Sequence, residues 1–295
     1  MNEHGTHTVC WEEMFPEELL EAIEACPVCY AAFGLAEPHG AYNAIGLDWL
    51  KARTLLERAA RTHGGIVAPP FAWHVAEAPH FPWVTAMGVR QPLCSSIPAD
   101  LFLRMVLYVI RAMDARGFHA GILVSGHYGG LEADLRLLSD YYLRRTGSPL
   151  RLWAGADWEL MRYENYHGDH AGICETAQLM ALCPDRVDLS RTDETAPHGP
   201  WIGTKFPLPD GRAPTRELGE QIIRSQIQTL GEIQRDLLAC HTPRPGWKAP
   251  SLTEAEGIWG RFELLTRKYW VFSQTMQEWQ KGQRVPFPGW EALGE

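Results

Sequence analysis

"HAGILVSGHYGG" (residues 119–130) is the stretch that decides the fold. Its first half is a nearly continuous apolar run, which is typical of a strand buried on both faces of a parallel sheet. Glycines at 126, 129 and 130 then interrupt the run. The next segment, 131–147, has helical spacing and ends in glycine. The sequence therefore predicts a strand, a tight turn and a helix in succession.

The same alternation of strand and helix runs through most of the chain. Further strands are predicted at 28–35, 66–71 and 150–155, and further helices at 16–25, 47–64, 98–118 and 175–184. This order predicts an α/β fold, a three-layer α/β/α sandwich with a mainly parallel sheet. In such sheets ligands bind beyond the carboxyl ends of the strands. The residues that follow each strand are therefore the first candidates for a functional site.

The composition argues against several kinds of partner. The chain has 295 residues and a net charge of −9, with 27 basic and 36 acidic residues and no basic run, so nucleic acid and anionic membranes are poor candidates. No apolar run reaches the roughly 18 residues needed to cross a membrane. The acidic N-terminus does not resemble a signal peptide. Seven cysteines without an export signal favour reduced thiols and a cytoplasmic location.

The C-terminal part has a different pattern. Residues 191–214 are rich in Pro, Gly and Thr and predict a surface loop, and two long helices are predicted at about 215–241 and 253–281. We therefore divide the chain into a core, 1–214, and a helical extension, 215–295, packed on that core.

The second of these helices carries many aromatic residues. Thr253 and Glu256 have the spacing of a capping box at its start. Trp259, Trp270 and Trp279 spread around much of the predicted helix, too widely for one buried face of a monomer. We therefore expect this helix to lie at a subunit interface.

The segment after the first strand, "AEPHGAYNAIGLD" (36–48), combines acids with a histidine. Glu37 and His39 are two residues apart and would point to the same side of an extended chain. Asp48 follows eleven residues after Glu37. Carboxylates and imidazoles are the usual ligands of zinc, manganese or iron. The alternative is a polar loop in which Asp48 caps the following helix.

Two further segments carry the same kinds of side chain. His127 ends the run at 119–130, beside glycines that let the backbone approach a ligand, although a lone histidine there can be an ordinary surface or core residue. "DHAGICET" (169–176) places Asp169, His170 and Glu175 before an apolar helix, where Glu175 could instead only favour the helix N-terminus. Together the three segments supply what a two-metal hydrolase needs: ligands, a shared carboxylate and a separate acid or base.

These three segments, in this order, resemble the motifs of the creatininase family over about residues 27–190. The resemblance implies an α/β/α fold, a metal-dependent amidohydrolase activity on a small-molecule substrate, and a homo-oligomer that is commonly a hexamer. It also implies one or two divalent ions per subunit, which would be Zn, Mn or Fe.

The resemblance implies a role for each residue as well. Glu37 and His39 would bind different metals, Asp48 would bridge them, and His127 would bind beside Glu37. Glu175 would be a further ligand or an anchor for its loop. A water activated by the metals would attack the carbonyl group, and His170, steadied by Asp169, would protonate the leaving group.

Aromatic residues near the third segment are candidates for substrate binding. Tyr128 matches the tyrosine that follows the turn histidine in creatininase, and Trp153 and Trp158 could form a wall for a small flat substrate. Tyr163 and Tyr166 could add to this wall, and ordinary core packing is the alternative for all of them. His80 matches a family position, for which we expect a structural role.

The sequence also departs from the family pattern. Gly129 stands where creatininase has a glutamate ligand, and Ser125 replaces the leading asparagine of the turn. One metal site could therefore be weaker, differently completed or empty. Two alternatives follow: a hydrolase or isomerase that opens a cyclic sugar ketone (inosose-like) or lactone, and a metal-degenerate, non-catalytic scaffold.

Overall fold

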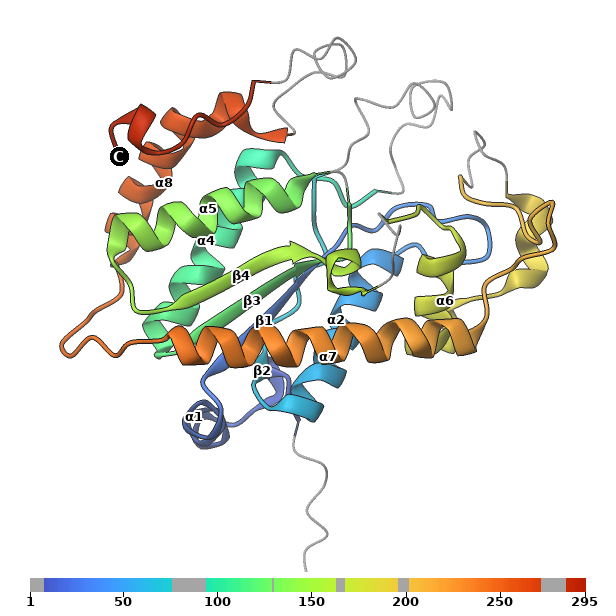
Figure 1. The fold of residues 1–295 in the computed structure, drawn as a ribbon, viewed down its shortest axis with the longest axis horizontal. Coiled ribbons are helices and arrows are strands. Elements are labelled where there is room, and N and C mark those ends of the chain that lie inside the picture. Colours follow the sequence, from blue (N-terminus) through green and yellow to red (C-terminus); the bar gives the residue numbers. More distant parts are fainter. Residues whose placement is uncertain (1–7, 76–93, 129, 163–167, 196–201, 272–284) are drawn as a thin grey trace, which may run out of the picture.

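Four parallel strands form the centre of the molecule, in the order β2-β1-β3-β4 (Figure 1). The structure, a computed structural model, describes residues 8–75, 94–128, 130–162, 168–195, 202–271 and 285–295. The strands are β1 (Val28–Phe33), β2 (Ile66–Val67), β3 (Ala120–Ser125) and β4 (Arg151–Ala156). All four lie where the sequence predicts them, although β2 is shorter than expected. Pro69 and Pro70 follow it closely, and proline cannot donate a hydrogen bond to a neighbouring strand.

Helices cover both faces of this sheet, which confirms the predicted α/β/α sandwich (Figure 1). One face is covered by α4 (Ala99–Arg116) and α5 (Leu131–Thr146), with α8 (Leu252–Thr266) outside them. The other face is covered by α2 (Leu47–His63) and α7 (Arg216–Cys240), with α6 (Ile173–Leu182) against both. The remaining helices are α1 (Pro16–Ala25) and the short 3-10 turns Trp11–Glu13, Asp157–Leu160, Pro184–Arg186, Leu189–Glu194, Arg267–Tyr269 and Glu291–Leu293.

The alternation of side chains along β1 builds both apolar cores. Cys29, Ala31 and Phe33 join the cluster under α4 and α5, whereas Val28, Tyr30 and Ala32 join the cluster under α2 and α7. Every residue of β1 is buried, as expected for a central parallel strand. The polar residues of this region are therefore confined to the strand ends.

The first turn of α2 rests directly on the ends of β1 and β3. A Cβ atom added at Gly126 would lie 2.1 Å from the Asp48 carbonyl oxygen, and one added at Gly34 would lie 2.4 Å from the Trp49 nitrogen. Only glycine leaves room for this approach. The packing brings the side chains of this helical turn to the carboxyl edge of the sheet.

The two C-terminal helices have different surroundings. α7 begins after Thr215, whose side chain accepts a hydrogen bond from the Leu218 N–H, and it packs against the sheet and α6. α8 packs against α4 and α5. The division of the chain at residues 214 and 215 remains a prediction.

The predicted helix at 253–281 needs two corrections. α8 begins one residue earlier, and its capping box pairs Ser251 with Glu254 rather than Thr253 with Glu256. The helix ends at Thr266 and is followed by a 3-10 turn, and residues 272–284 lie outside the described residues.

Three aromatic residues of this segment are buried within their own chain. Trp259, Phe262 and Trp270 are 5%, 0% and 0% exposed and lie against one another beneath α8. The expectation that Trp259 and Trp270 need a second subunit to cover them is therefore wrong. Trp279 lies outside the described residues.

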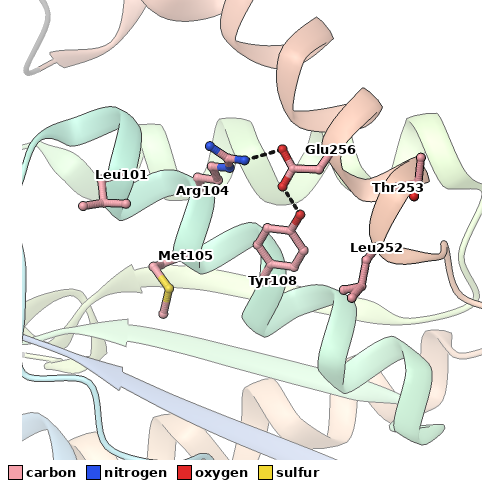
Figure 2. A pocket seen from close by; sticks show the side chains of 7 residues that line it. All are labelled: Leu101, Arg104, Met105, Tyr108, Leu252, Thr253 and Glu256. Carbon is pink, nitrogen blue, oxygen red and sulfur yellow. Dashed lines mark hydrogen bonds and ion pairs between the residues drawn. The ribbon is translucent and has the colours of Figure 1, made fainter.

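A shallow groove lies between α4 and α8 on the outer surface (Figure 2). Leu101 and Leu252, which are 48% and 61% exposed, lie along it. Between them, Glu256 of α8 pairs with Arg104 and accepts a hydrogen bond from Tyr108, both of which belong to α4. Apolar and charged side chains thus share this surface.

Among the residues that the structure describes, no helix is both long enough and apolar enough to span a membrane. All seven cysteines are free thiols.

Candidate metal centre

Three neighbouring strands each deliver an ionisable residue to one place. Glu37 follows β1, His127 follows β3, and Asp157 comes directly after β4. Asp48 comes from the first turn of α2, and Glu175 from the first turn of α6. These positions lie at the carboxyl edge of the sheet, where ligands bind in folds of this class.

The first group of possible ligands consists of Glu37, Asp48 and His127. The Nδ1 atom of His127 lies 3.2 Å from Oε1 of Glu37 and 3.1 Å from Oδ2 of Asp48. One ligand atom from each of the three residues lies within 4.8 Å of the others. This spacing suits a single metal ion, and we call the group the Glu37 triad.

The second group consists of His39, Asp48 and Glu175. The Nε2 atom of His39 lies 2.9 Å from Oδ1 of Asp48 and 3.6 Å from Oε2 of Glu175. These three ligand atoms also lie within 4.8 Å of one another. We call this group the Glu175 triad. Asp48 faces the two triads with different oxygen atoms, an arrangement that suits a bridging carboxylate.

The geometry favours the site roles over several of the alternatives that the sequence left open. The N-cap residue of α2 is Gly46, so Asp48 is not the cap. Asp48 is instead 1% exposed and faces two histidines. His127 is 6% exposed and lies within the cluster, so it is not a surface residue. Glu175 faces His39, so its role is not limited to favouring the N-terminus of α6.

Hydrogen bonds orient the histidines for metal binding. Nδ1 of His39 lies 2.9 Å from the Glu37 carbonyl oxygen, which orients Nε2 toward the carboxylates. The backbone of His127 is held by the Ser125 hydroxyl, which donates to the His127 carbonyl oxygen at 2.6 Å. The same hydroxyl lies 3.1 Å from Nε2 of the buried His74. The carbonyl partner of Nδ1 fixes the ring of His39, whereas the Ser125 hydroxyl fixes the backbone of His127.

The electrostatics agree with a site built for cations. Burial by itself would raise the pKa of Asp48, but His39 and His127 hold the pKa well below its usual range. Burial would likewise lower the pKa of His39, but the carboxylates of Asp48 and Glu175 outweigh it and raise the pKa to about 9. The Asp48 carboxylate therefore stays ionised, and His39 holds a proton that a metal ion would have to displace.

The sequence analysis missed Lys51. It lies one turn after Asp48 on α2 and is fully buried. Its Nζ atom lies 2.5 Å from Oε1 of Glu175, 2.5 Å from the Tyr128 hydroxyl and 3.4 Å from Oδ2 of Asp157. Burial alone would lower its pKa, but Asp157 and Glu175 raise it, so Lys51 is a permanent cation.

The sequence contained a signal for Lys51 and for Asp157, which it pairs with. Lys51 has the same helical spacing as the apolar positions 55 and 59, so it falls on the buried face of α2. Asp157 is the first residue after β4, and strand ends are where site residues gather.

His170 lies at the open side of the cluster. It is 37% exposed, and its Nδ1 atom lies 3.8 Å from Oε1 of Glu37. Its Nε2 atom donates to the Pro38 carbonyl oxygen at 2.9 Å. Desolvation by its neighbours and the charge of His39 lower the pKa of His170, so the ring is neutral near pH 7. It can accept a proton at Nδ1.

The backbone beside His170 is held in an uncommon conformation. Ala171 has φ +49°, a left-handed value that is rare for residues other than glycine. Its N–H donates to Oε2 of Glu175, and its carbonyl oxygen accepts from the Tyr42 hydroxyl, both at 2.7 Å. These bonds fix the point from which His170 projects.

Asp169 has a different set of contacts from those predicted. Its carboxylate accepts hydrogen bonds from the N–H groups of Cys174 and Glu175 at 2.9 and 3.0 Å. These N–H groups belong to the first turn of α6, which has no carbonyl partners for them. The described contacts thus favour a helix-capping role for Asp169, and His170 is held by Pro38 instead.

The structure brings two of the three predicted substrate-binding residues together. A Cβ atom added at Gly168 would lie 3.0 Å from the Tyr128 ring and 3.5 Å from the Trp158 ring, so these rings share one place beside the cluster. Trp153 lies within β4 and packs against the apolar core under α7. This position favours the alternative of core packing for Trp153. Gly129, His80, Tyr163 and Tyr166 lie outside the described residues.

The two triads fit a pair of divalent ions. Each offers one imidazole, one glutamate and a share of Asp48, a mixed nitrogen and oxygen donor set suited to zinc or manganese. Asp48 and Glu175 are buried and Glu37 is 14% exposed, and burial of carboxylates is unfavourable unless they are paired or bind metals. Both triads are complete without residue 129.

Comparisons with known proteins give consistent matches. The family model for creatininase (creatinine amidohydrolase) matches residues 12–234. A creatinine amidohydrolase from Pseudomonas putida is 24% identical over 234 residues, which cover 69% of this chain and 86% of the relative.

Solved structures match the fold. A crystal structure of creatinine amidohydrolase (creatininase) matches with a TM-score of 0.61 and 20% identity, covering 79% of this chain and 99% of the other. A manganese creatininase gives a TM-score of 0.59 at 22% identity, and a mutant creatininase of the Zn-Zn type gives 0.58 at 21%. Each of these two matches covers 78% of this chain and 98% of the other.

Proposed function

The chain belongs to the creatininase family, and from this premise we propose that it is a metal-dependent amidohydrolase. It opens a small cyclic amide or cleaves a related C–N bond. The observation that carries the proposal is the pair of triads that share Asp48. Two such sites side by side are the arrangement used by two-metal hydrolases.

The residues of the cluster would serve as ligands to two different ions. Glu37 and His127 would hold one ion, His39 and Glu175 would hold the other, and Asp48 would bridge them. When bound, such ions supply Lewis acidity toward a carbonyl oxygen and lower the pKa of water. Manganese and zinc are the metals named for solved relatives, and we propose a divalent ion of this kind at each site.

His170 moves the proton. Its exposed ring at the open side of the cluster can meet a substrate, and Nδ1 is the free nitrogen because Nε2 is bonded to Pro38. Nδ1 accepts a proton from the attacking water and returns it to the leaving nitrogen of the substrate. Asp169 supports this step indirectly, because it caps the helix that carries Glu175.

Tyr128 and Trp158 give the substrate a flat surface. The Tyr128 hydroxyl accepts a hydrogen bond from Lys51, so its ring is held in place. Rings of this kind stack on planar groups such as a cyclic amide. The relatives named creatinine amidohydrolase act on one compound of this shape.

Metal content and a substrate screen test the proposal together. Purified protein should contain about two divalent ions per chain, as the two triads require, and should hydrolyse at least one member of a panel of lactams and formamides. Turnover of lactones or cyclic sugar ketones alone would identify the alternative enzyme class. Protein that binds no added Zn²⁺ or Mn²⁺ would identify the non-catalytic scaffold instead.

We also propose that the enzyme is a cytoplasmic homo-oligomer. A hexamer is the assembly that we expect, because it is common in this family. The free cysteines favour a reducing compartment. The exposed Leu101 and Leu252 in the groove of Figure 2 are the apolar side chains that we expect at a subunit contact. The Leu252→Asp variant should sediment as a smaller species than the native protein. Native protein that sediments as a monomer at micromolar concentration would refute the oligomer.

A further inference from the structure

The two triads have the same donors but different surroundings. Each has one histidine, one glutamate of its own and the shared Asp48. Chemistry alone would give them similar metal affinities. A difference between them must come from the groups around the ligands.

Lys51 is the group that distinguishes them. It contacts Glu175 at 2.5 Å and is fully buried. In the part of the chain that the structure describes, the ion pairs of Glu37, Asp48 and Glu175 include no other lysine or arginine. Within the described residues, Glu37 thus has histidines but no lysine or arginine among its ion-pair partners.

Lys51 also determines how Glu175 can bind. Its ammonium group occupies Oε1, whereas Oε2 faces His39. Oε2 in turn accepts the N–H of Ala171 at 2.7 Å. Glu175 is therefore prepared to bind an ion through one oxygen only, and part of its charge is already neutralised.

We propose that Lys51 is a positioning residue that makes the two metal sites unequal, so that the Glu37 triad binds its ion tightly and the Glu175 triad binds its ion weakly. This inference rests on the proposed function. Its physical basis is that a buried unit charge a few ångströms from a divalent ion repels it in a medium that screens poorly. The charge also acts on Asp48, but both ions share that residue.

The test measures metal affinity rather than activity. Native protein is titrated with Zn²⁺ against a chromophoric chelator at constant pH, and two dissociation constants are expected. In Glu175→Gln the weaker step should disappear, and in Glu37→Gln the tighter step should disappear. Equal constants in the native protein would overturn the inference.

The decisive variant is Lys51→Met, which removes the charge but keeps an unbranched side chain. We expect the ratio of the two constants to fall by about tenfold or more, because the weaker site becomes tighter. Arg53→Met is the matched control, since Arg53 is a buried cation on the same helix that pairs with Glu12 and Glu57. The ratio should not change in the control.

A second variant covers the case in which Lys51→Met does not fold. Lys51→Met combined with Asp157→Asn removes both members of the buried pair, so Asp157 is not left as an unpaired charge. Glu175 regains its second oxygen, and the ratio should still fall. An unchanged ratio in whichever of the two variants folds would overturn the inference.

The outcomes also separate this inference from the proposed function. Native protein that binds no Zn²⁺ refutes the metal centre itself. Two unequal dissociation constants whose ratio does not change when Lys51 is replaced refute only the inference. Two sites that become more equal without Lys51 support the inference even if no amide substrate is found.

Discussion

Two groups of three side chains in this protein have the same chemistry but opposite surroundings. The inner trio is Lys51, Glu175 and Tyr128, and the outer trio is Arg104, Glu256 and Tyr108 (Figure 2). In each trio the cation pairs with a glutamate from another helix. The tyrosine hydroxyl is bonded to Lys51 in the inner trio and to Glu256 in the outer trio. Lys51 and Glu175 are 0% and 1% exposed, whereas Arg104 and Glu256 are 46% and 42% exposed.

The difference shows that burial determines how strongly a charge acts on its neighbours. Water screens the outer trio, and exposed ion pairs of this kind contribute about 0–1 kcal/mol to stability. The inner trio is screened far less, so Lys51 acts on Glu175 and Asp48 directly. Side chains of the same kinds therefore join α4 to α8 in the outer trio and act on the metal ligands in the inner trio.

The largest effect should come from Asp48, at the centre of the inner region. Asp48→Asn removes the anionic bridge, so both ions should be lost and activity should fall by more than about 1,000-fold, since metal catalysis supplies several kcal/mol. Metal analysis and turnover check this. Asp114→Asn is the control, because Asp114 is a buried carboxylate bonded to Tyr142 and Ser148 away from the cluster. Full metal content in Asp48→Asn would remove Asp48 from the centre.

His170 should show the next largest effect, because we propose that it moves a proton at the open side of the cluster. A ring nitrogen of His170 also lies within 4.8 Å of donor atoms of Glu37 and His39, so metal content is measured as well. His170→Ala should keep both ions and lose about 100-fold in turnover, the usual scale for a general acid or base. His63→Ala, whose ring contacts the Ile227 carbonyl oxygen, serves as the control. A parallel loss of metal would make His170 a ligand instead.

Acidity should weaken metal binding at the inner region in a graded way. The pKa of His39 is raised to about 9, so at pH 7 it carries a proton that must leave before Nε2 can bind an ion. Affinity should therefore rise with pH toward 9, by up to about tenfold per pH unit for each proton released. Calorimetry in buffers of different ionisation enthalpy counts these protons. Binding without proton release would contradict the pKa of His39.

The smallest effect should come from the outer trio. Glu256→Gln removes the ion pair with Arg104 and should change the free energy of unfolding by less than about 1 kcal/mol. Urea denaturation measures this, with metal content unchanged. A loss comparable to that of a buried pair, about 3–5 kcal/mol, would mean that the groove is covered in the native assembly.

Local patterns in the sequence predicted the fold and most of the cluster. Apolar runs located β1, β3 and β4, and residues just beyond their ends, such as Glu37 and His127, lie in the centre. Strand ends are predictable because the backbone sets them. The resemblance to the family added what spacing could not supply, namely that Asp48 lies between the two groups.

Long-range partners explain what was missed. Helical spacing places Lys51 on the buried face of α2, but its partner Glu175 is 124 residues away, so no local pattern identifies that partner. The aromatic residues in and just after α8 were misjudged for the same reason. Trp270 packs on Trp259 and Phe262 only because the chain turns after Thr266, which shortens the helix.

The contact of α2 with the sheet has a consequence for attempts to alter the enzyme. Asp48 and Lys51 belong to one turn of helix, which lies against Gly34 and Gly126 with no space for a methyl group. A larger residue at either glycine would displace the bridge and the buried cation together. In a randomised library these two positions should therefore accept glycine alone. Changes in substrate preference should arise instead around Trp158 and Tyr128, where the wall can vary while the centre stays intact.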